Sequence, residues 1–535
     1  MTGAATQTAT RPPSTAAAGA VPGSRVAAVA ARRLLLLVPA LLVAGSATAA
    51  VALTGFDGLY GQGSFAYFTY STGALRQSLL HLHPWPAFFW PPGYPLLVAV
   101  VSFVTGSVPL AGQIVSISAG AAAACFTGLL ASELVVGDRA EGPRPGPTWL
   151  PVPVLAGLIV AVTGQLFQSS IVVMSDTLGL AAATAGAWAI VRYRRTGEAR
   201  WLAISAGAFA WAISTRWIYG IVALPFAGWA LVLLARRPRR TSLLHAAGAA
   251  VVGAVILGPT LAPAIAGLVT GGNAPFAGDL QVYSWSPLNA LQRVFMTGDG
   301  RLVYNLPNGL YYLIAPATWW YFGPILAALI VPGLWGALRR RTVPGVGLML
   351  AWVAVVYAFH AGAPWQNPRF TLAYLPPLSI LAAVGFAQLR ASGDRSIRRA
   401  ATVWLVSGLA LAAVGSAVLT DRFIERKQND VATVRWTERL APRHAQLLTF
   451  GLTATFQHYG QVPTLDLSEI GSSKIAQLLS DGRPTLVLLD VADIDRQWTG
   501  RPPWANYRAL RDGPGLVRLG ARGVYTLFSV AGGAP

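Results

Sequence analysis

The sequence predicts an α-helical polytopic membrane protein with about eleven spanning helices, one interfacial helix and a small α/β domain at its C-terminus. Of the 535 residues, 54% are hydrophobic and only 11% are charged, whereas ordinary soluble domains contain about 25% charged residues. Apolar stretches of about 20 residues recur along the chain, and each is long enough to cross a hydrocarbon core of about 30 Å as a helix. These two observations exclude a soluble globular protein.

The chain divides into three predicted parts. Residues 1–33 are rich in Ala, Thr and Pro and are expected to form a disordered cytoplasmic tail without a cleavable signal peptide. Residues 34–420 form the predicted transmembrane domain, and residues 421–535 form the predicted α/β domain. The eleven spans are expected at residues 34–53, 110–136, 149–168, 176–191, 201–215, 217–235, 243–269, 312–336, 344–361, 370–389 and 401–420.

The distribution of arginines sets the predicted topology. With these spans, the N-terminal tail and the cytoplasmic loops carry 21 arginines, and the outer loops before the C-terminal domain carry five. Because basic residues accumulate in cytoplasmic loops, the N-terminus is predicted to be cytoplasmic and the C-terminal domain extracytoplasmic, in the plasma membrane. The same loops explain most of the net charge of +20, so membrane lipid is an expected partner and nucleic acid is not.

Three segments outside the spans are predicted on the outer face. The first outer loop, residues 54–109, contains the apolar segment 91–108. If this segment crossed the membrane, the later arginine clusters would face outward, so it is interpreted as an interfacial or re-entrant helix. The second outer loop covers residues 271–311. In the C-terminal segment, a polar helical stretch and several apolar runs alternate as in an α/β domain of ordinary size: 447–450, 468–479, 485–489 and 523–530.

Acidic residues are scarce on the predicted outer face before the C-terminal domain, where the sequence places only Asp57, Asp176, Asp279 and Asp299. Asp57 follows the first span closely, where a carboxylate is costly to desolvate and is usually functional or paired. A helix cap, or an ion pair with Arg76 or Arg369, is the alternative role for Asp57. Asp176 follows Ser175 at the start of a span and either caps that helix or takes part in function.

The first outer loop also carries aromatic and histidine residues that are candidates for substrate binding. Tyr60 follows Asp57, and Tyr94 lies near the end of the loop, although most aromatic residues at this depth simply anchor a protein at the interface. His81 and His83 form a pair, but two histidines alone do not define a metal site. No metal site is therefore predicted. The need for a divalent cation stays open, because the sequence offers no firm ligand set.

Two arginines stand at the outer mouths of predicted spans. Arg369 precedes Phe370, and Arg216 lies in a tight turn before Trp217. On a face poor in arginine, both are candidates for binding a lipid phosphate, with snorkelling to lipid headgroups as the alternative. The chain has no Walker-type phosphate loop, no His-Glu-x-x-His motif and no Gly-x-Ser-x-Gly motif. These absences disfavour ATP-driven transport and the commoner hydrolases.

Four features in chain order resemble the GT-C glycosyltransferases, which include protein O-mannosyltransferases, bacterial aminoarabinose transferases and actinobacterial mannosyl- and arabinosyltransferases. They are Asp57 after the first span, the aromatic stretch Trp90-Pro91-Pro92-Gly93-Tyr94-Pro95, the pair Ser175-Asp176, and Arg369-Phe370 before a proline-containing span. The resemblance covers residues 34–420. Many members carry two adjacent acids in the first loop, whereas Gly58 follows Asp57 here, so a metal-dependent or two-carboxylate mechanism lacks support.

The resemblance implies a membrane glycosyltransferase that moves a mannose- or arabinose-like sugar from a polyprenyl-phosphate donor to a glycan, lipid or protein acceptor of the cell envelope. Asp57 would accept the proton of the acceptor hydroxyl, with inversion at the sugar carbon. Arg369, together with Arg216, would stabilise the phosphate leaving group. The remaining expected substrate-binding residues are Asp176, Tyr60, Tyr94, His81 and His83.

Two other classes of protein stay open. A secondary transporter, or a flippase for lipid-linked sugars, is expected to show paired repeats and helices broken near the membrane midplane, and neither feature is evident in the sequence. A cell-wall scaffold that has lost catalysis would tolerate the loss of Asp57. The sequence does not define the sugar or the acceptor.

Overall fold

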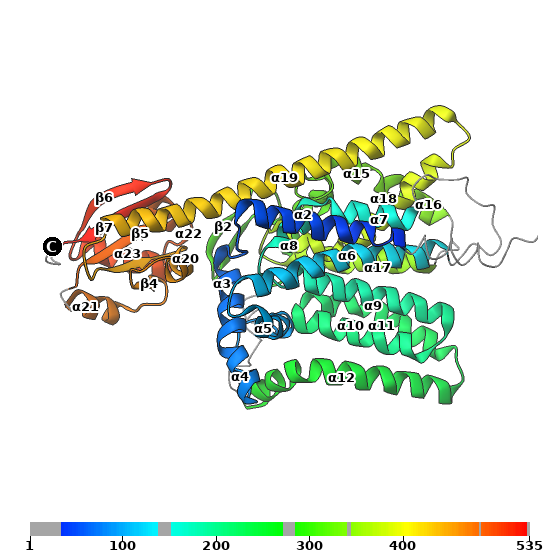
Figure 1. Cartoon of the computed structure of the whole chain (residues 1–535), viewed down its shortest axis with the longest axis horizontal. Coiled ribbons are helices and arrows are strands. Elements are labelled where there is room, and N and C mark those ends of the chain that lie inside the picture. The colour runs from blue at the N-terminus through cyan, green and yellow to red at the C-terminus, as the bar shows by residue number, and fades with distance from the viewer. Residues whose placement is uncertain (1–33, 137–150, 271–283, 340–343, 481–482, 532–535) are drawn as a thin grey trace, which may run out of the picture.

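The computed structural model of the protein describes residues 34–136, 151–270, 284–339, 344–480 and 483–531. The predicted N-terminal tail and Asp279 lie outside these residues. The described chain forms a bundle of long helices and, beyond one end of the bundle, a C-terminal domain that contains a β-sheet (Figure 1).

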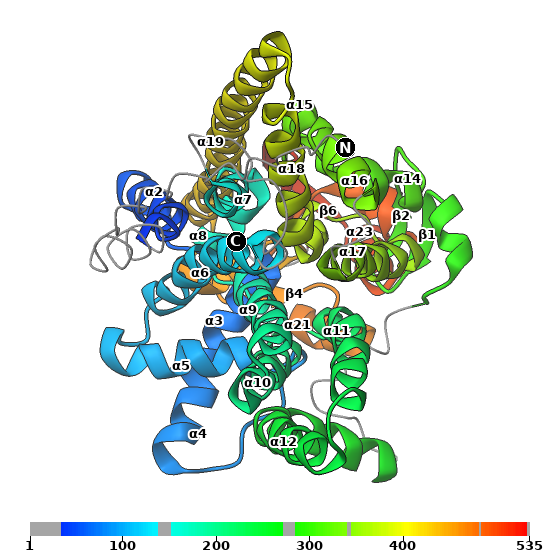
Figure 2. The ribbon, with the colours of Figure 1, turned by 90° about the vertical axis from the view of Figure 1, so that its right-hand side faces the viewer.

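The long helices of the bundle arise from the apolar stretches of the sequence. Viewed along the bundle (Figure 2), α6 and α9 lie near the middle, and α12 and α19 lie at opposite margins. The most apolar window of α12 has 0% of its residues buried, so this helix presents its surface to lipid. The helices are α2 (Val38–Thr54), α6 (Leu110–Val136), α7 (Val152–Ala161), α8 (Gly164–Ile171), α9 (Asp176–Thr196), α10 (Ala199–Thr215), α11 (Ile218–Ala235), α12 (Arg239–Thr270), α15 (Gly323–Ala328), α16 (Ile330–Arg339), α17 (Pro344–Gly362), α18 (Leu375–Arg390) and α19 (Arg395–Leu440).

Glycines allow neighbouring helices to approach closely. α16 and α18 meet at Gly333 and Gly385. A Cβ atom at Gly333 would collide with the carbonyl oxygen of Leu381, and one at Gly385 would collide with the carbonyl oxygen of Leu329. Small residues serve this purpose in membrane bundles, where close van der Waals packing replaces the hydrophobic effect as the force between helices.

The described helices do not confirm the predicted number of spans. Among the described residues, six helices are long and apolar enough to cross a membrane, or seven if α7 and α8 are counted together as one bent span. Three shorter apolar helices cover Val38–Thr54, Gly93–Thr105 and Gly323–Arg339. The chain is a multi-pass membrane protein, but the predicted total of eleven spans is not confirmed.

Two predicted spans are broken in the structure. The span predicted at 149–168 consists of α7 and α8, which meet at an angle of 62°, where Thr163 adopts an extended backbone conformation. The span predicted at 312–336 is divided among α14 (Asn308–Ile314), a short 3-10 turn, α15 and α16. Pro316 and Pro324 lie at these divisions, and proline cannot donate the backbone hydrogen bond that a continuous helix needs.

A layer of short helices lies across the end of the bundle that faces the C-terminal domain (Figure 1). It comprises α3 (Gly61–Thr69), the π-helix η1 (Tyr70–Leu75), α4 (Arg76–His81) and α5 (Gly93–Thr105). α5 occupies the segment predicted to be interfacial. Its 13 residues span about 20 Å, less than the hydrocarbon thickness of about 30 Å.

The C-terminal domain contains a five-stranded sheet with the order β4-β3-β5-β7-β6. The first three strands in this order are parallel, and β7 and β6 are antiparallel to their neighbours. Three of the strands and one helix lie on the runs that the sequence analysis singled out. The elements are β3 (Gln446–Thr449), α20 (Thr453–Tyr459), β4 (Thr464–Asp466), α21 (Ser472–Ser480), β5 (Thr485–Leu489), α22 (Val491–Gln497), α23 (Pro502–Asp512), β6 (Leu516–Arg522) and β7 (Tyr525–Val530).

The C-terminal domain is joined to the bundle at several points, two of which involve α19 and a hairpin from the second loop. The first is α19, a continuous helix of 46 residues, so the predicted domain boundary between residues 420 and 421 falls inside a helix. No proline interrupts it, although its second half is polar. The second is the hairpin of β1 (Val294–Thr297) and β2 (Gly300–Val303) from the second loop, where Gln497 Nε2 donates to the Asp299 carbonyl oxygen at 2.7 Å.

Candidate active site

Asp57 lies at the junction between the bundle and the C-terminal domain. Its carboxylate accepts hydrogen bonds from Lys427 Nζ on α19 and from the hydroxyl of Tyr459 at the end of α20. It also accepts a 3.0 Å bond from the backbone N–H of Leu59. The Asp57 side chain is 30% exposed, whereas that of Lys427 is 10% exposed. The partner of Asp57 is therefore Lys427, not Arg76 or Arg369.

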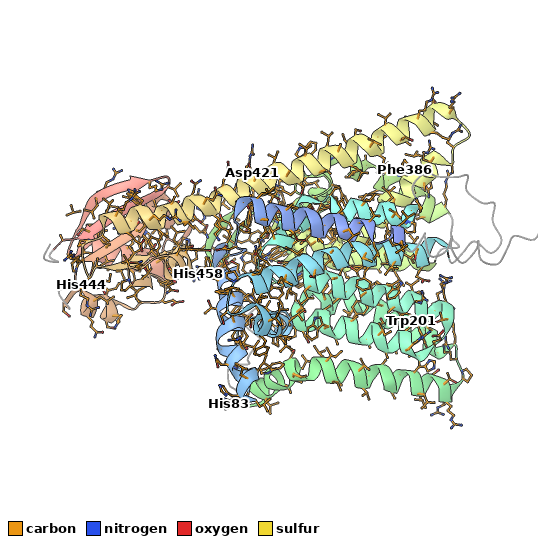
Figure 3. All side chains as sticks on the ribbon, viewed as in Figure 1. His83, Trp201, Phe386, Asp421, His444 and His458 are labelled. Carbon is orange, nitrogen blue, oxygen red and sulfur yellow. The ribbon has the colours of Figure 1, made fainter. Side chains whose placement is uncertain are left out.

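Aromatic side chains surround Asp57, Lys427 and Tyr459. His458 packs at 5.7 Å from Phe65 and 5.5 Å from Phe68, both on α3, and Figure 3 shows His458 between the domain and the bundle. Burial lowers the pKa of His458. Burial, reinforced by the hydrogen bond to Asp57, raises the pKa of Tyr459. Its phenol therefore stays protonated and acts as the hydrogen-bond donor to the Asp57 carboxylate.

Gly58 explains why a second acid does not follow Asp57. Its φ is +87°, a conformation that side chains disfavour, and a Cβ atom would lie 2.8 Å from Gln113 Cγ and 2.9 Å from Val173 Cγ2. The carbonyl oxygen of Gly58 accepts a 3.0 Å hydrogen bond from the N–H of Val173. This bond places the Asp57 loop beside the chain that leads into Asp176.

Asp176 is the centre of a second charged cluster. Its side chain is only 3% exposed; it forms an ion pair with Arg216 and lies 3.5 Å from Arg369 Nε. Both guanidinium groups also lie over the Phe370 ring, at 5.6 and 5.9 Å from its centroid. Three of the residues predicted from the sequence, from three distant segments, are thus brought together. The Asp176 carboxylate is held by two arginines, as expected of a buried charge.

Local backbone structure positions the two arginines. Arg216 ends α10 in an extended conformation. The start of α5 packs directly against this end, because a Cβ at Gly93 would lie 2.6 Å from the Ser214 carbonyl oxygen. Arg369 opens a 3-10 helix (Pro368–Tyr374) whose cap is Asn367, the side chain of which accepts the Arg369 N–H at 3.0 Å. The Gly93 and Asn367 positions therefore aim Arg216 and Arg369 at Asp176.

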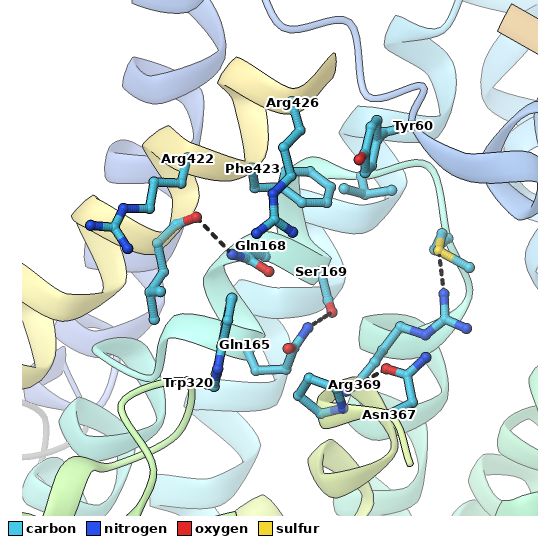
Figure 4. Close-up of a pocket in the computed structure, with 14 residues that line it drawn as sticks. Tyr60, Gln165, Gln168, Ser169, Trp320, Asn367, Arg369, Arg422, Phe423 and Arg426 are labelled. Atoms are coloured by element: carbon cyan, nitrogen blue, oxygen red, sulfur yellow. Dashed lines mark hydrogen bonds between the residues drawn. The ribbon is translucent and has the colours of Figure 1, made fainter. Parts of the chain in front are cut away.

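Two cavities, each of about 330 Å³, adjoin this region and share Arg369 and Met174. The first, here named the arginine cavity, lies between α8, α19 and the Arg369 turn (Figure 4). Its lining contains three arginines and no carboxylate. Its charged and polar lining residues are Tyr60, Gln165, Gln168, Ser169, Asn367, Arg369, Arg422 and Arg426.

The second cavity, here named the aromatic cavity, holds the Asp176 cluster. Arg216 and Arg369 line it together with His360 of α17, and the rest of its wall is made of six aromatic residues and of small or aliphatic ones. The aromatic lining residues are Tyr67, Trp90, Trp217, Tyr219, Phe359 and Phe370. An apolar wall with a few convergent polar groups is the usual character of a small-molecule site.

Three predicted substrate-binding residues lie outside both cavities. Tyr94 is fully buried, and its hydroxyl is satisfied by Ser116 Oγ at 2.9 Å, so we assign it a packing role. His81 and His83 lie at the end of α4 with ring centroids 5.8 Å apart, and Figure 3 shows His83 far from the C-terminal domain. Within the described part of the chain, no group of three or more metal-ligating side chains comes together.

Lys427, Tyr459 and His360 are among the residues of this region that escaped the sequence analysis. Lys427 did carry a signal, because it is one of only two lysines in the chain and stands at the point where a spanning helix turns polar. Tyr459 is one of 16 tyrosines and carried none. His360 lies in an apolar run that reads simply as a spanning helix.

The chain has the fold seen in solved structures of GT-C membrane glycosyltransferases, as predicted. The structure of ArnT from Cupriavidus metallidurans bound to undecaprenyl phosphate matches with a TM-score of 0.58 and 14% identity over 96% of this chain and 100% of that chain. Its apo structure matches equally, over 95% and 99%. The mycobacterial arabinofuranosyltransferase AftD matches with a TM-score of 0.44 and 16% identity, over 91% of this chain and 41% of that chain. No protein-family model and no curated protein sequence matches the chain.

Proposed function

We propose that the protein is a membrane glycosyltransferase that moves a sugar from a polyprenyl-phosphate donor to a cell-envelope acceptor. The observation that carries this proposal is the convergence of Asp176, Arg216 and Arg369 in an aromatic cavity that adjoins the arginine cavity. The fold shared with ArnT, which was solved with undecaprenyl phosphate, supports a lipid phosphate as part of the donor. A mannose- or arabinose-like sugar is the first choice for testing.

In the proposed step, the oxygen of an acceptor hydroxyl bonds to the anomeric carbon of the donor sugar. The bond from that carbon to the phosphate oxygen breaks, and its electron pair leaves with the lipid phosphate. Arg369 lines both cavities, so its guanidinium is placed to stabilise this growing negative charge. A single displacement of this kind inverts the configuration at the sugar carbon.

We propose that Asp57 accepts the proton of the acceptor hydroxyl, which would approach through the arginine cavity. Tyr60, three residues further on, lines that cavity and packs at 4.7 Å from Phe423, another of its lining residues. Lys427 and Tyr459 fix the orientation of the Asp57 carboxylate. Asp176 is less suited to this role, because its side chain is only 3% exposed whereas that of Asp57 is 30% exposed.

The proposed orientation follows from the arginine distribution. With the N-terminus in the cytoplasm, the two cavities and the C-terminal domain face outward. Nucleotide sugars are not available on that side, so a lipid-linked donor whose chain remains in the bilayer is required. The acceptor would be a glycan, lipid or protein of the envelope.

The test uses purified full-length protein in lipid nanodiscs with radiolabelled polyprenyl-phosphate mannose, arabinose or glucose and fractions of a cell-envelope extract. We expect transfer from one donor to one acceptor fraction in the wild type and none in Asp57→Asn. Failure of every donor with every fraction, in folded protein that binds undecaprenyl phosphate, would reject the proposed activity.

A transporter or flippase for lipid-linked sugars is the second candidate, and one observation favours it. The bent pair α7–α8 is a broken span, a feature common in transporters that was not evident from the sequence. Against it, the charged candidates cluster at one end of the bundle. Fluorescently labelled polyprenyl-phosphate sugar in proteoliposomes distinguishes the two functions, because a flippase equilibrates the lipid between leaflets without any acceptor.

A further inference from the structure

His360 is a buried polar side chain whose two ring nitrogens have no partner in the described structure. It is 4% exposed, and neither Nδ1 nor Nε2 has a hydrogen bond. A neutral imidazole carries one donor and one acceptor, and leaving such groups unpaired inside a protein costs roughly 1–3 kcal/mol each. The two ring nitrogens are therefore expected to form hydrogen bonds with a ligand or with water.

The ring of His360 is held so that only its edge can reach a ligand. Tyr312 stacks on it at a centroid distance of 5.3 Å with an interplanar angle of 26°, and Phe370 stacks at 5.2 Å and 14°. The backbone is fixed just beyond, because Asn289 Nδ2 donates to the Gly362 carbonyl oxygen at 2.8 Å. Stacked rings lie against its two faces and the residue lines the aromatic cavity, so the ring edge is the part left to meet a ligand bound there.

We infer that His360 hydrogen-bonds a hydroxyl group of the donor sugar, and that the aromatic cavity is where the sugar binds. The inference rests on the proposed function. The cavity has the right chemistry: aromatic walls suit the apolar faces of a sugar ring. An imidazole edge exchanges hydrogen bonds with a hydroxyl, which both donates and accepts. Arg369 at the boundary of the two cavities would then hold the adjoining phosphate.

His360 is therefore assigned as a specificity residue that positions the sugar, not as an acid or base in the reaction. A site built to pair a substrate hydroxyl rejects an analogue that lacks it, because the polar group of the protein is then left unpaired. Donors with a missing or inverted hydroxyl at the contacted carbon are expected to be poor substrates.

The test compares His360→Phe with His245→Phe in full-length protein. His245 is a matched control. It lies on α12 outside both cavities, and its Nδ1 is already paired with the Tyr193 hydroxyl at 2.9 Å. The probes are undecaprenyl phosphate alone and its mannosyl, arabinosyl and glucosyl derivatives. We expect His360→Phe to weaken binding of the preferred sugar lipid about tenfold, the equivalent of one hydrogen bond, and to leave binding of undecaprenyl phosphate unchanged.

Stability gives a second, independent readout. Phe can fill the stack between Tyr312 and Phe370 without burying unpaired nitrogens, so His360→Phe should unfold at the same temperature as the wild type or higher. His245→Phe should lower the unfolding temperature and leave sugar-lipid binding intact. A His360→Gln variant, which keeps a donor and an acceptor, should recover part of the affinity.

Three outcomes would overturn the inference. One is equal binding of all four lipids by the wild type. Another is equal loss by His360→Phe for undecaprenyl phosphate and for the sugar lipids, which would mean that the cavity binds phosphate. The third is no loss at all. Failure of the proposed function gives a different result from failure of this inference. In that case the sugar lipids bind in a manner that depends on His360, but no sugar is transferred to any acceptor.

Discussion

At the scale of single residues, the two acids proposed from the sequence occupy contrasting environments. Asp57 is partly exposed and is oriented by donors from another part of the fold, whereas Asp176 is buried between two arginines. A proton acceptor must be reachable by the group that it deprotonates, and Asp57 meets this condition better. The same contacts allow Asp57 a purely structural role, so the two roles must be separated by experiment.

The Asp57→Asn substitution should abolish transfer and leave the fold intact. Asn matches Asp in size and retains one oxygen acceptor for Lys427 or Tyr459 but cannot take a proton, and loss of a general base costs roughly 10²–10⁴-fold in rate. The measurement is transfer turnover together with the unfolding temperature. Near wild-type turnover in stable Asp57→Asn protein would show that Asp57 serves only to hold the C-terminal domain against the bundle.

The Arg369→Ala substitution should weaken donor use far more than Arg293→Ala. Arg369 lines both cavities, whereas Arg293 is exposed beside β1. Loss of a charge-assisted contact with phosphate costs roughly 2–5 kcal/mol, or about 30-fold and upward in affinity. Arg369→Lys should recover only part, because an ammonium lacks the planar pair of donors. Similar donor affinities for the two alanine variants would remove Arg369 from the phosphate site.

At the scale of helices, the sequence identified the apolar segments well but not their breaks. Composition defines where a helix is stable in lipid. The bend between α7 and α8 depends instead on how Thr163 and Gly164 pack against their neighbours, since Gly164 lies against Ser416 of α19 and the Trp320 carbonyl. Such a bend is a tertiary effect that a hydropathy pattern does not carry.

The crossing of α16 and α18 gives a prediction about packing. Gly385→Ala should destabilise the bundle, because the new Cβ would collide with the Leu329 carbonyl oxygen and force the helices apart. Overpacking of this kind costs typically 1–3 kcal/mol. Gly347→Ala on α17, where nothing lies within 4 Å of the added atom, is the matched control. Equal unfolding temperatures for the two variants would show that the crossing tolerates separation.

At the scale of the whole molecule, the C-terminal domain completes the junction around Asp57. Residues predicted from the sequence form the Asp176 cluster, because each of them stood at a helix end near the same membrane surface. The partners of Asp57 could not be predicted, since Lys427 and Tyr459 lie 370 and 402 residues away in the chain. Contacts over such separations depend on domain docking, which short sequence patterns do not encode.

Lys427→Met should loosen the domain from the bundle. Breaking a fully buried ion pair costs about 3–5 kcal/mol. We expect roughly 1–3 kcal/mol here, because the Asp57 side chain keeps 30% exposure and water can solvate it in part. Limited proteolysis and hydrogen exchange at α20 should both increase, and Lys474→Met, at an exposed position of α21, should change neither. Unchanged exchange at α20 would show that the aromatic contacts of His458 hold the domain by themselves.

The topology can be tested on the same scale. A cysteine introduced at Ser473, which is exposed on α21, should react with a membrane-impermeant thiol reagent in intact spheroplasts. The native Cys125 lies within a spanning helix and should not react. Labelling of Ser473→Cys only after lysis would place the C-terminal domain in the cytoplasm and reverse the proposed orientation.

The unbroken length of α19 has a mechanical consequence. A helix of 46 residues is a rod of about 69 Å, and its Leu419–Arg426 stretch forms one wall of the arginine cavity while its far end enters the sheet domain. A stiff rod transmits rotation, so a tilt of the sheet domain by a bound polymer would swing Arg422 and Leu419 relative to α8. Lys427, held at Asp57, then serves as the pivot. Binding of a large acceptor to the sheet domain would then change the width of the arginine cavity.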